Sequence, residues 1–207
     1  MTSKLTLYNG ANRLLGERRL LTLTEDRPSR RYLDDAWDDG LVDDALEQGF
    51  WNFATRSVEM TASTSVEPEF GYRYAFQKPD DYIRTAALCT DEYFRHTLNE
   101  YTDEAHYWFA DHDTLYLQYI SNDSVYGNNM ANWSGTFVGL VEAMLADEVK
   151  ELVTGNDGKY DRIKKALKDA RIDARSKDAM NQPVKFAPAG TWVSARMTSR
   201  VNNDGTT

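Results

Sequence analysis

The densest group of side chains that could do chemistry is a run of carboxylates with no Lys or Arg among them, between Tyr32 and Ala54. It consists of Asp34, Asp35, Asp38, Asp39, Asp43, Asp44 and Glu47. Two carboxylates can act as general acid and base when burial or a charged partner shifts the pKa of one of them. These seven instead fall on the polar side of an expected helix, opposite a stripe of Leu and Ala. The pattern favours a solvated acidic surface, of which we single out Asp34, Asp38, Asp39 and Asp43.

Other candidate groups lack the spacing of known sites. The histidines, which form neither H-E-x-x-H nor an i,i+4 pair, are His96, His106 and His112. Residues 111–113 (DHD) fall at an expected hairpin turn, where Asp is favoured for backbone reasons. Residues 155–160 (GNDGKY) have only two residues between the glycines, so they predict a helix–helix turn and not a phosphate loop. Cys89 lies in an apolar strand and is expected to be a buried thiol. We therefore expect no enzyme activity, cofactor or metal.

Composition indicates a folded chain. It has 207 residues, 24 Lys and Arg against 33 Asp and Glu, a net charge of -9 and 12% aromatic residues. The acidic balance argues against nonspecific adhesion to nucleic acid, which needs a basic face. A single cysteine excludes an internal disulfide and suits a reducing cytosol. There is no run long and apolar enough for a membrane helix, and the start of the sequence lacks the pattern of a secretory signal.

Periodicity predicts an α+β fold with a four-helix core. The first helix has Thr2 or Ser3 as its cap and Gly16 at its end, and the second runs over 28–50 with Pro28 in its first turn. Asn132 is expected to cap the third helix, and the fourth follows the turn at 155–158. Strands are expected at 56–66 and 82–90, with a hairpin of 105–111 and 114–121. They form one small antiparallel sheet inserted after the second helix.

Three parts follow from this order of elements. Residues 1–55 and 123–181 are expected to form a discontinuous helical core domain, and residues 56–122 an inserted β-rich lobe. Residues 182–207 lack periodicity and are expected to form an extended C-terminal arm. Phe186 and Trp192 are isolated aromatics in that arm, which favours docking on a partner. The alternative is that they fold back onto their own helices.

Charge is also segregated along the chain. The seven acids above precede a segment, 156–200, that has eleven Lys and Arg against five Asp. One interpretation is that acidic and basic helices form salt bridges within one subunit. The other is that unlike faces meet between neighbouring subunits, a head-to-tail contact that can close into a ring. The sequence alone leaves both open.

Eight segments in order along the chain resemble one protein family. They are 7–11 (LYNGA), 14–20 (LLGERRL), 37–40 (WDDG), 46–54 (LEQGFWNFA), 68–76 (PEFGYRYAF), 78–81 (KPDD), 175–181 (RSKDAMN) and 188–192 (PAGTW). Together they are similar to the tail tubular protein A family of tailed phages, the head-to-tail adaptors of the viral neck. The resemblance covers about residues 4–196.

The resemblance implies a structural virion protein of the neck and tail, made in the cytoplasm of a host bacterium. Such adaptors form a dodecameric ring that contacts the portal protein and the tail tube or nozzle protein, without a membrane. Viral DNA passes through the lumen without specific binding. The acidic residues would then line the lumen or meet the basic helix of a neighbouring subunit. The alternatives are a virion enzyme that degrades the cell wall, supported only by the acids, and a nucleic-acid-binding regulator.

Overall fold

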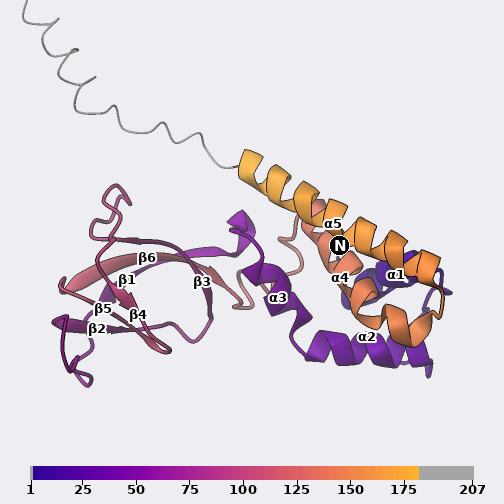
Figure 1. Cartoon of the computed structure of the whole chain (residues 1–207), viewed down its shortest axis with the longest axis horizontal. Helices are drawn as coiled ribbons and strands as arrows, with labels where there is room; N and C mark the ends of the chain where they lie inside the picture. The colour runs from indigo at the N-terminus through magenta and orange to yellow at the C-terminus, as the bar shows by residue number, and fades with distance from the viewer. Residues whose placement is uncertain (1, 182–207) are drawn as a thin grey trace, which may run out of the picture.

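The computed structural model describes residues 2–181 and places helices and strands at opposite ends of an elongated molecule (Figure 1). The expected α+β class is confirmed. The helices are α1 (Lys4–Leu15), α2 (Pro28–Asp38), α3 (Leu41–Glu47), α4 (Gly135–Val153) and α5 (Asp157–Met180), with a short 3-10 helix at Asn52–Ala54. The strands are β1 (Thr55–Thr61), β2 (Tyr74–Gln77), β3 (Tyr82–Cys89), β4 (Thr102–Asp103), β5 (Tyr107–Ala110) and β6 (Thr114–Ser121). The expected arm, with Phe186 and Trp192, lies outside the described residues.

Local capping signals fix the helix ends largely as expected. The Ser3 hydroxyl accepts a hydrogen bond from the Thr6 amide at 3.3 Å and caps α1. Gly16 ends α1 with φ of 74°, a left-handed conformation that costs glycine little. Pro28 occupies the first turn of α2. These signals depend on near neighbours in the sequence, which is why periodicity and capping rules locate them.

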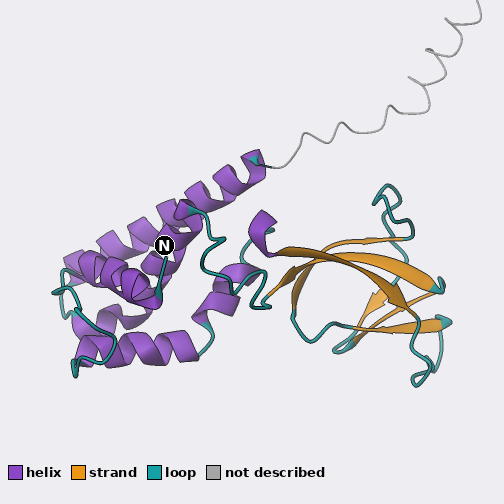
Figure 2. Cartoon of the chain, turned by 180° about the vertical axis from the view of Figure 1, so that it is seen from behind, coloured by secondary structure: helices purple, strands orange, loops and turns teal. Residues whose placement is uncertain are grey.

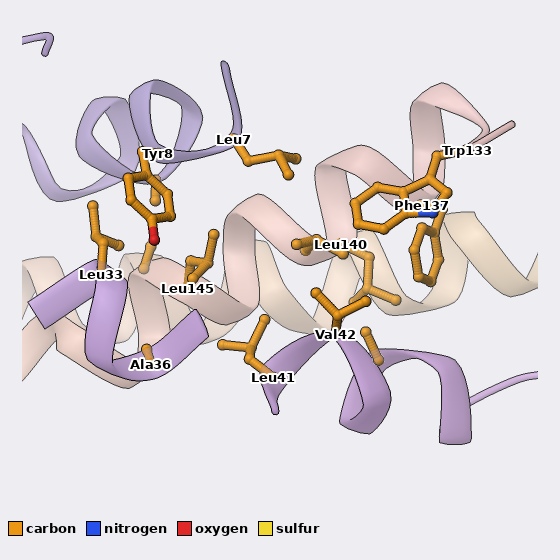
Figure 3. Close-up of a cluster of buried hydrophobic side chains, with 14 of the residues drawn as sticks. Leu7, Tyr8, Leu33, Ala36, Leu41, Val42, Trp133, Phe137, Leu140 and Leu145 are labelled. Carbon is orange, nitrogen blue, oxygen red and sulfur yellow. The ribbon is translucent and has the colours of Figure 1, made fainter. Parts of the chain in front are cut away.

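The expected helix over 28–50 is wrong as a single element, because Gly40 divides it. Gly40 has φ of 94°, which a continuous right-handed helix cannot contain, so α2 ends at Asp38 and α3 begins at Leu41. The helical body therefore has five helices where four were expected. The change of direction at Gly40 lets Leu33 and Ala36 of α2 and Leu41 and Val42 of α3 bury against the same core (Figure 3).

Helix α4 lies at the centre of the helical body and packs against α1, α2, α3 and α5. Its Phe137 ring contacts those of Trp51 and Trp133 at centroid distances of 4.9 and 5.0 Å. The expected cap, Asn132, is wrong. Ser134 caps α4, accepting a hydrogen bond from the Phe137 amide at 3.2 Å. The aromatic cluster thus holds the start of α4 against the segment that leads into β1.

The strands form two three-stranded antiparallel sheets, β1–β6–β3 and β2–β5–β4, and not the one sheet expected (Figure 2). The expected hairpin of 105–111 and 114–121 is also wrong, because β5 and β6 belong to different sheets. Trp108 of β5 and Leu115 and Leu117 of β6 are buried in one shared core between the sheets. Alternation along a strand can mark its buried side, but it carries no information on which strand pairs with which.

Candidate interaction surfaces

The acidic residues of α2 are partly neutralised inside the chain. The Asp34 carboxylate accepts a hydrogen bond from the Tyr8 hydroxyl at 2.8 Å and lies 3.3 Å from the Lys4 ammonium. It also pairs with Arg30 one turn earlier. Burial, and then the bond to Asp34, raise the pKa of the Tyr8 hydroxyl. Asp34 therefore joins α1 to α2. The Asp38 carboxylate also lies within ion-pair distance of the Lys4 ammonium, at 3.7 Å, but its side chain is 75% exposed.

The acids around α3 have two further environments. Asp43 accepts a hydrogen bond from the Asn122 side chain at 3.1 Å, which ties α3 to the segment after β6. Asp39 and Asp44 line a groove of about 240 Å³ whose walls include Asp147 and Arg171. The four acids singled out from the sequence thus do not share one face. Asp34 and Asp43 have structural partners, and Asp38 and Asp39 remain exposed.

Helix α5 is rich in cations. It has eight Lys and Arg residues, and none of the ion pairs within residues 2–181 includes one of them. Ile163 and Ala174 anchor its inner side in the core. Over the described chain, the acids of α2 pair with Lys4 and Arg30, so the interpretation in which acidic and basic helices form salt bridges with each other is wrong for α2 and α5. Arg171 of α5 lines the groove described above together with Asp39 and Asp44.

A carboxylate that sequence reasoning missed joins strands β1 and β6 to the start of β3. Asp81 follows β2 and accepts hydrogen bonds from Arg56 at 2.9 Å, from the Tyr119 hydroxyl at 2.9 Å and from the Ser121 hydroxyl. Burial opposes its ionisation, but the bonds from Ser121, Tyr119 and Arg56 together hold the pKa of Asp81 below its ordinary value. The Asp81 carbonyl also accepts a bond from the Asn122 amide at 3.0 Å. In the sequence, this residue appeared only as the last residue of the segment 78–81 (KPDD) that contributes to the family resemblance.

A second joint connects α5 to the start of the strands. The buried Asp178 carboxylate accepts a hydrogen bond from the Asn52 amide at 3.2 Å, and the Asn52 side chain donates to the Asp178 carbonyl at 2.9 Å. Burial raises the pKa of Asp178 more than the bonds from Asn52 lower it. These hydrogen bonds therefore hold the last turn of α5 against the short helix that precedes β1, where the chain passes from the helical body into the strands.

The 111–113 segment and Cys89, the other candidate groups from the sequence, lie in structural positions. Asp111 accepts a hydrogen bond from the Arg73 amide at 3.1 Å, and the Asp113 carbonyl accepts one from the Ala62 amide at 3.2 Å. Cys89 is buried, as expected. Within residues 2–181, no three His, Cys, Asp or Glu side chains are grouped so that they could hold a metal ion. Over the same residues, none of the helices is both long and apolar enough to cross a membrane.

Comparison with known proteins adds no assignment: no protein-family model matches the chain, and no curated protein sequence matches it.

Proposed function

We propose that the chain is a structural virion protein, a subunit of the ring-shaped head-to-tail adaptor that joins the portal to the tail tube or nozzle of a tailed phage. The eight segments that resemble tail tubular protein A suggest this function. The structural observation that carries it is the set of eight α5 cations, six of them exposed, that form no ion pair within residues 2–181, on a chain whose net charge is -9. Extended charged faces of this kind suit a protein that works by contact between subunits.

The acidic charge of the chain suits a conduit for DNA. A channel wall that bound phosphates would slow the polyanion that passes through it, and a net acidic chain avoids that contact. At physiological salt, charge repulsion acts over only about 8 Å, so it affects DNA close to the wall and does not steer DNA from a distance. Asp38 and Asp39 are the members of the expected acidic face that remain exposed for such a role. Their alternative role is contact with a neighbouring subunit.

Immunogold labelling of intact virus particles with an antibody to this chain tests the proposal. We expect label confined to the junction between capsid and tail. A preparation treated with antibody that has been preabsorbed with the purified chain serves as control. Absence of the chain from both intact and disrupted particles would rule out a virion protein. In that case, zymography with host wall material and a gel shift with DNA would test the enzyme and the regulator.

A further inference from the structure

The outer side of the β2–β5–β4 sheet has a groove. The groove measures about 460 Å³, and Phe109, Tyr72 and the loop at 66–72 line it. Phe109 is only partly buried, whereas its neighbours Trp108 and Ala110 are buried in the core, so Phe109 points away from the core. Phe70 in the same loop is 86% exposed, the largest fraction among the exposed large hydrophobic residues of the described chain.

The rim of this groove is acidic. Glu67, Glu69 and Glu104 line it, all three are exposed, and no Lys or Arg lines it. None of these glutamates takes part in the ion pairs found within residues 2–181. Aromatic rings with carboxylates at their edges favour a surface that presents aliphatic carbon and cations together, through burial, cation–π contacts and ion pairing. We use the name lobe groove for this groove, with its aromatic residues Phe70, Tyr72 and Phe109 and its three glutamates.

The outer side of α5 presents that combination. Ile172 is 57% exposed. Lys165 and Lys168 precede Ile172 by seven and four residues and Arg175 follows it by three, so they share its side of the helix, where the exposed Asp169 leaves a net charge of +2. All three cations are exposed, and the opposite side of α5 buries Ile163 and Ala174. We name the four exposed residues the α5 outer face.

We propose that the lobe groove of one copy docks on the α5 outer face of the next copy. This inference rests on the proposed adaptor ring and names the contact that builds it. Ile172 enters the aromatic floor of the groove, and the three cations of the α5 outer face meet the three glutamates of the rim. Both unpartnered faces belong to the same chain and have opposite charge, which is why a second copy is the occupant.

The arrangement of the molecule supports a contact between copies. The β2–β5–β4 sheet is at the strand end, away from the helical body that α5 borders, in both views (Figures 1 and 2). The two faces are therefore separated within one copy and available to two different neighbours. A contact between unlike faces is heterologous, and repetition of a heterologous contact closes into a ring when the rotation per subunit allows it.

Charge reversal on each face tests the contact. The lobe variant combines Glu67→Lys, Glu69→Lys and Glu104→Lys, and the helix variant combines Lys165→Glu, Lys168→Glu and Arg175→Glu. Sedimentation velocity of the full chain measures self-association at about 50 mM and about 500 mM salt. We expect wild-type association that weakens with salt, and association at least about tenfold weaker for each variant alone. A control with lysine at Asp80, Glu92 and Glu151 changes charge as much as the lobe variant and should associate like wild type.

An equimolar mixture of the two variants provides the decisive result. In the mixture, the lysines of one variant face the glutamates of the other at every contact, so we expect association to return. A single chain with all six reversals should also associate. Circular dichroism and thermal unfolding establish that each variant is folded, as expected for substitutions at exposed positions.

Three outcomes would overturn the inference: a wild-type chain that stays monomeric at every concentration, a variant that associates like wild type, or folded variants that do not associate when mixed. The labelling of virus particles reports on the proposed function separately. Label at the neck together with any of these outcomes would leave the adaptor in place and move its subunit contact elsewhere.

Discussion

The hydrogen bonds to Asp81 make Asp81→Asn a sharp test of how strands β1 and β6 are joined to the start of β3. Its side chain is 18% exposed and accepts bonds from Arg56, Tyr119 and Ser121. Asparagine keeps one acceptor oxygen but turns an amide group toward these donors and leaves the Arg56 charge without its partner. A hydrogen bond to a charged group contributes about 1.5–3 kcal/mol. Because the two hydroxyls can turn toward other acceptors, we expect a loss of about 2–4 kcal/mol in the free energy of unfolding.

Thermal and urea unfolding of the full chain, followed by circular dichroism, measure this loss. For a chain of about 200 residues, it lowers the melting temperature by about 5–10 °C. Asp80→Asn is the matched control, because Asp80 is the exposed neighbour and its replacement should change stability by less than about 0.5 kcal/mol. Hydrogen exchange should show the added opening at β1 and β6, the strands that donate to Asp81. An Asp81→Asn chain as stable as the Asp80→Asn chain would refute the reasoning.

The pH dependence of the Asp81 effect has a definite sign. The folded chain holds the pKa of Asp81 below its ordinary value, so the carboxylate contributes stability at every pH above the ordinary aspartate pKa of about 4. That contribution disappears as the pH falls through the lowered folded-state pKa. We therefore expect the wild-type and Asp81→Asn chains to differ most near neutral pH and to converge in acid. A difference that grows below pH 4 would contradict this account.

Two further predictions concern glycine and Asp178. Gly127→Ala should destabilise the chain by about 2 kcal/mol or more, since a Cβ there would lie 2.2 Å from the Ser121 carbonyl oxygen. Gly139→Ala, inside α4 with nothing within 4 Å of the added carbon, should stabilise it by about 0.5–1 kcal/mol, and urea unfolding of both chains checks the opposite signs. Burial raises the pKa of Asp178, so its charge costs stability above the folded-state pKa. Asp178→Asn keeps an acceptor for the Asn52 amide and should be at least as stable at pH 7, with any advantage lost in acid; a large loss at pH 7 would contradict this.

Sequence reasoning located the features that depend on near neighbours. Ser3, Gly16 and Pro28 act on the backbone within a few residues, so their positions alone predicted the ends of α1 and the start of α2. Gly40 was recognised as a weak point of a helix, but whether a glycine merely weakens a helix or divides it depends on the packing of both halves. In this fold, the left-handed conformation of Gly40 lets α3 reach the core beside α4.

Strand pairing and the Asp81 joint could not be predicted in the same way. Alternation marks one side of a strand as buried, and β5 and β6 both bury side chains in one core although they belong to different sheets. The donors to Asp81 are 25 to 40 residues away in the sequence, on β1 and β6. The segment 78–81 therefore gave no sign of these partners, and only the folded chain brings the Asp81 carboxylate to Arg56 and Tyr119.

The internal partners of the acidic residues on α2 and α3 affect which surface is proposed to contact α5. In the sequence, seven acids without a base suggested one negative surface opposite the basic helix. In the folded chain, Asp34 is neutralised by Lys4 and Arg30, and Asp43 is committed to Asn122. The acidic surface on α2 and α3 is therefore weaker than the count of residues suggests, whereas six of the eight α5 cations are exposed. The glutamates of the lobe groove have no such internal partners in the described chain, and they surround apolar surface that can receive Ile172. This difference in internal pairing is the reason to assign the contact of α5 to the lobe of a neighbour.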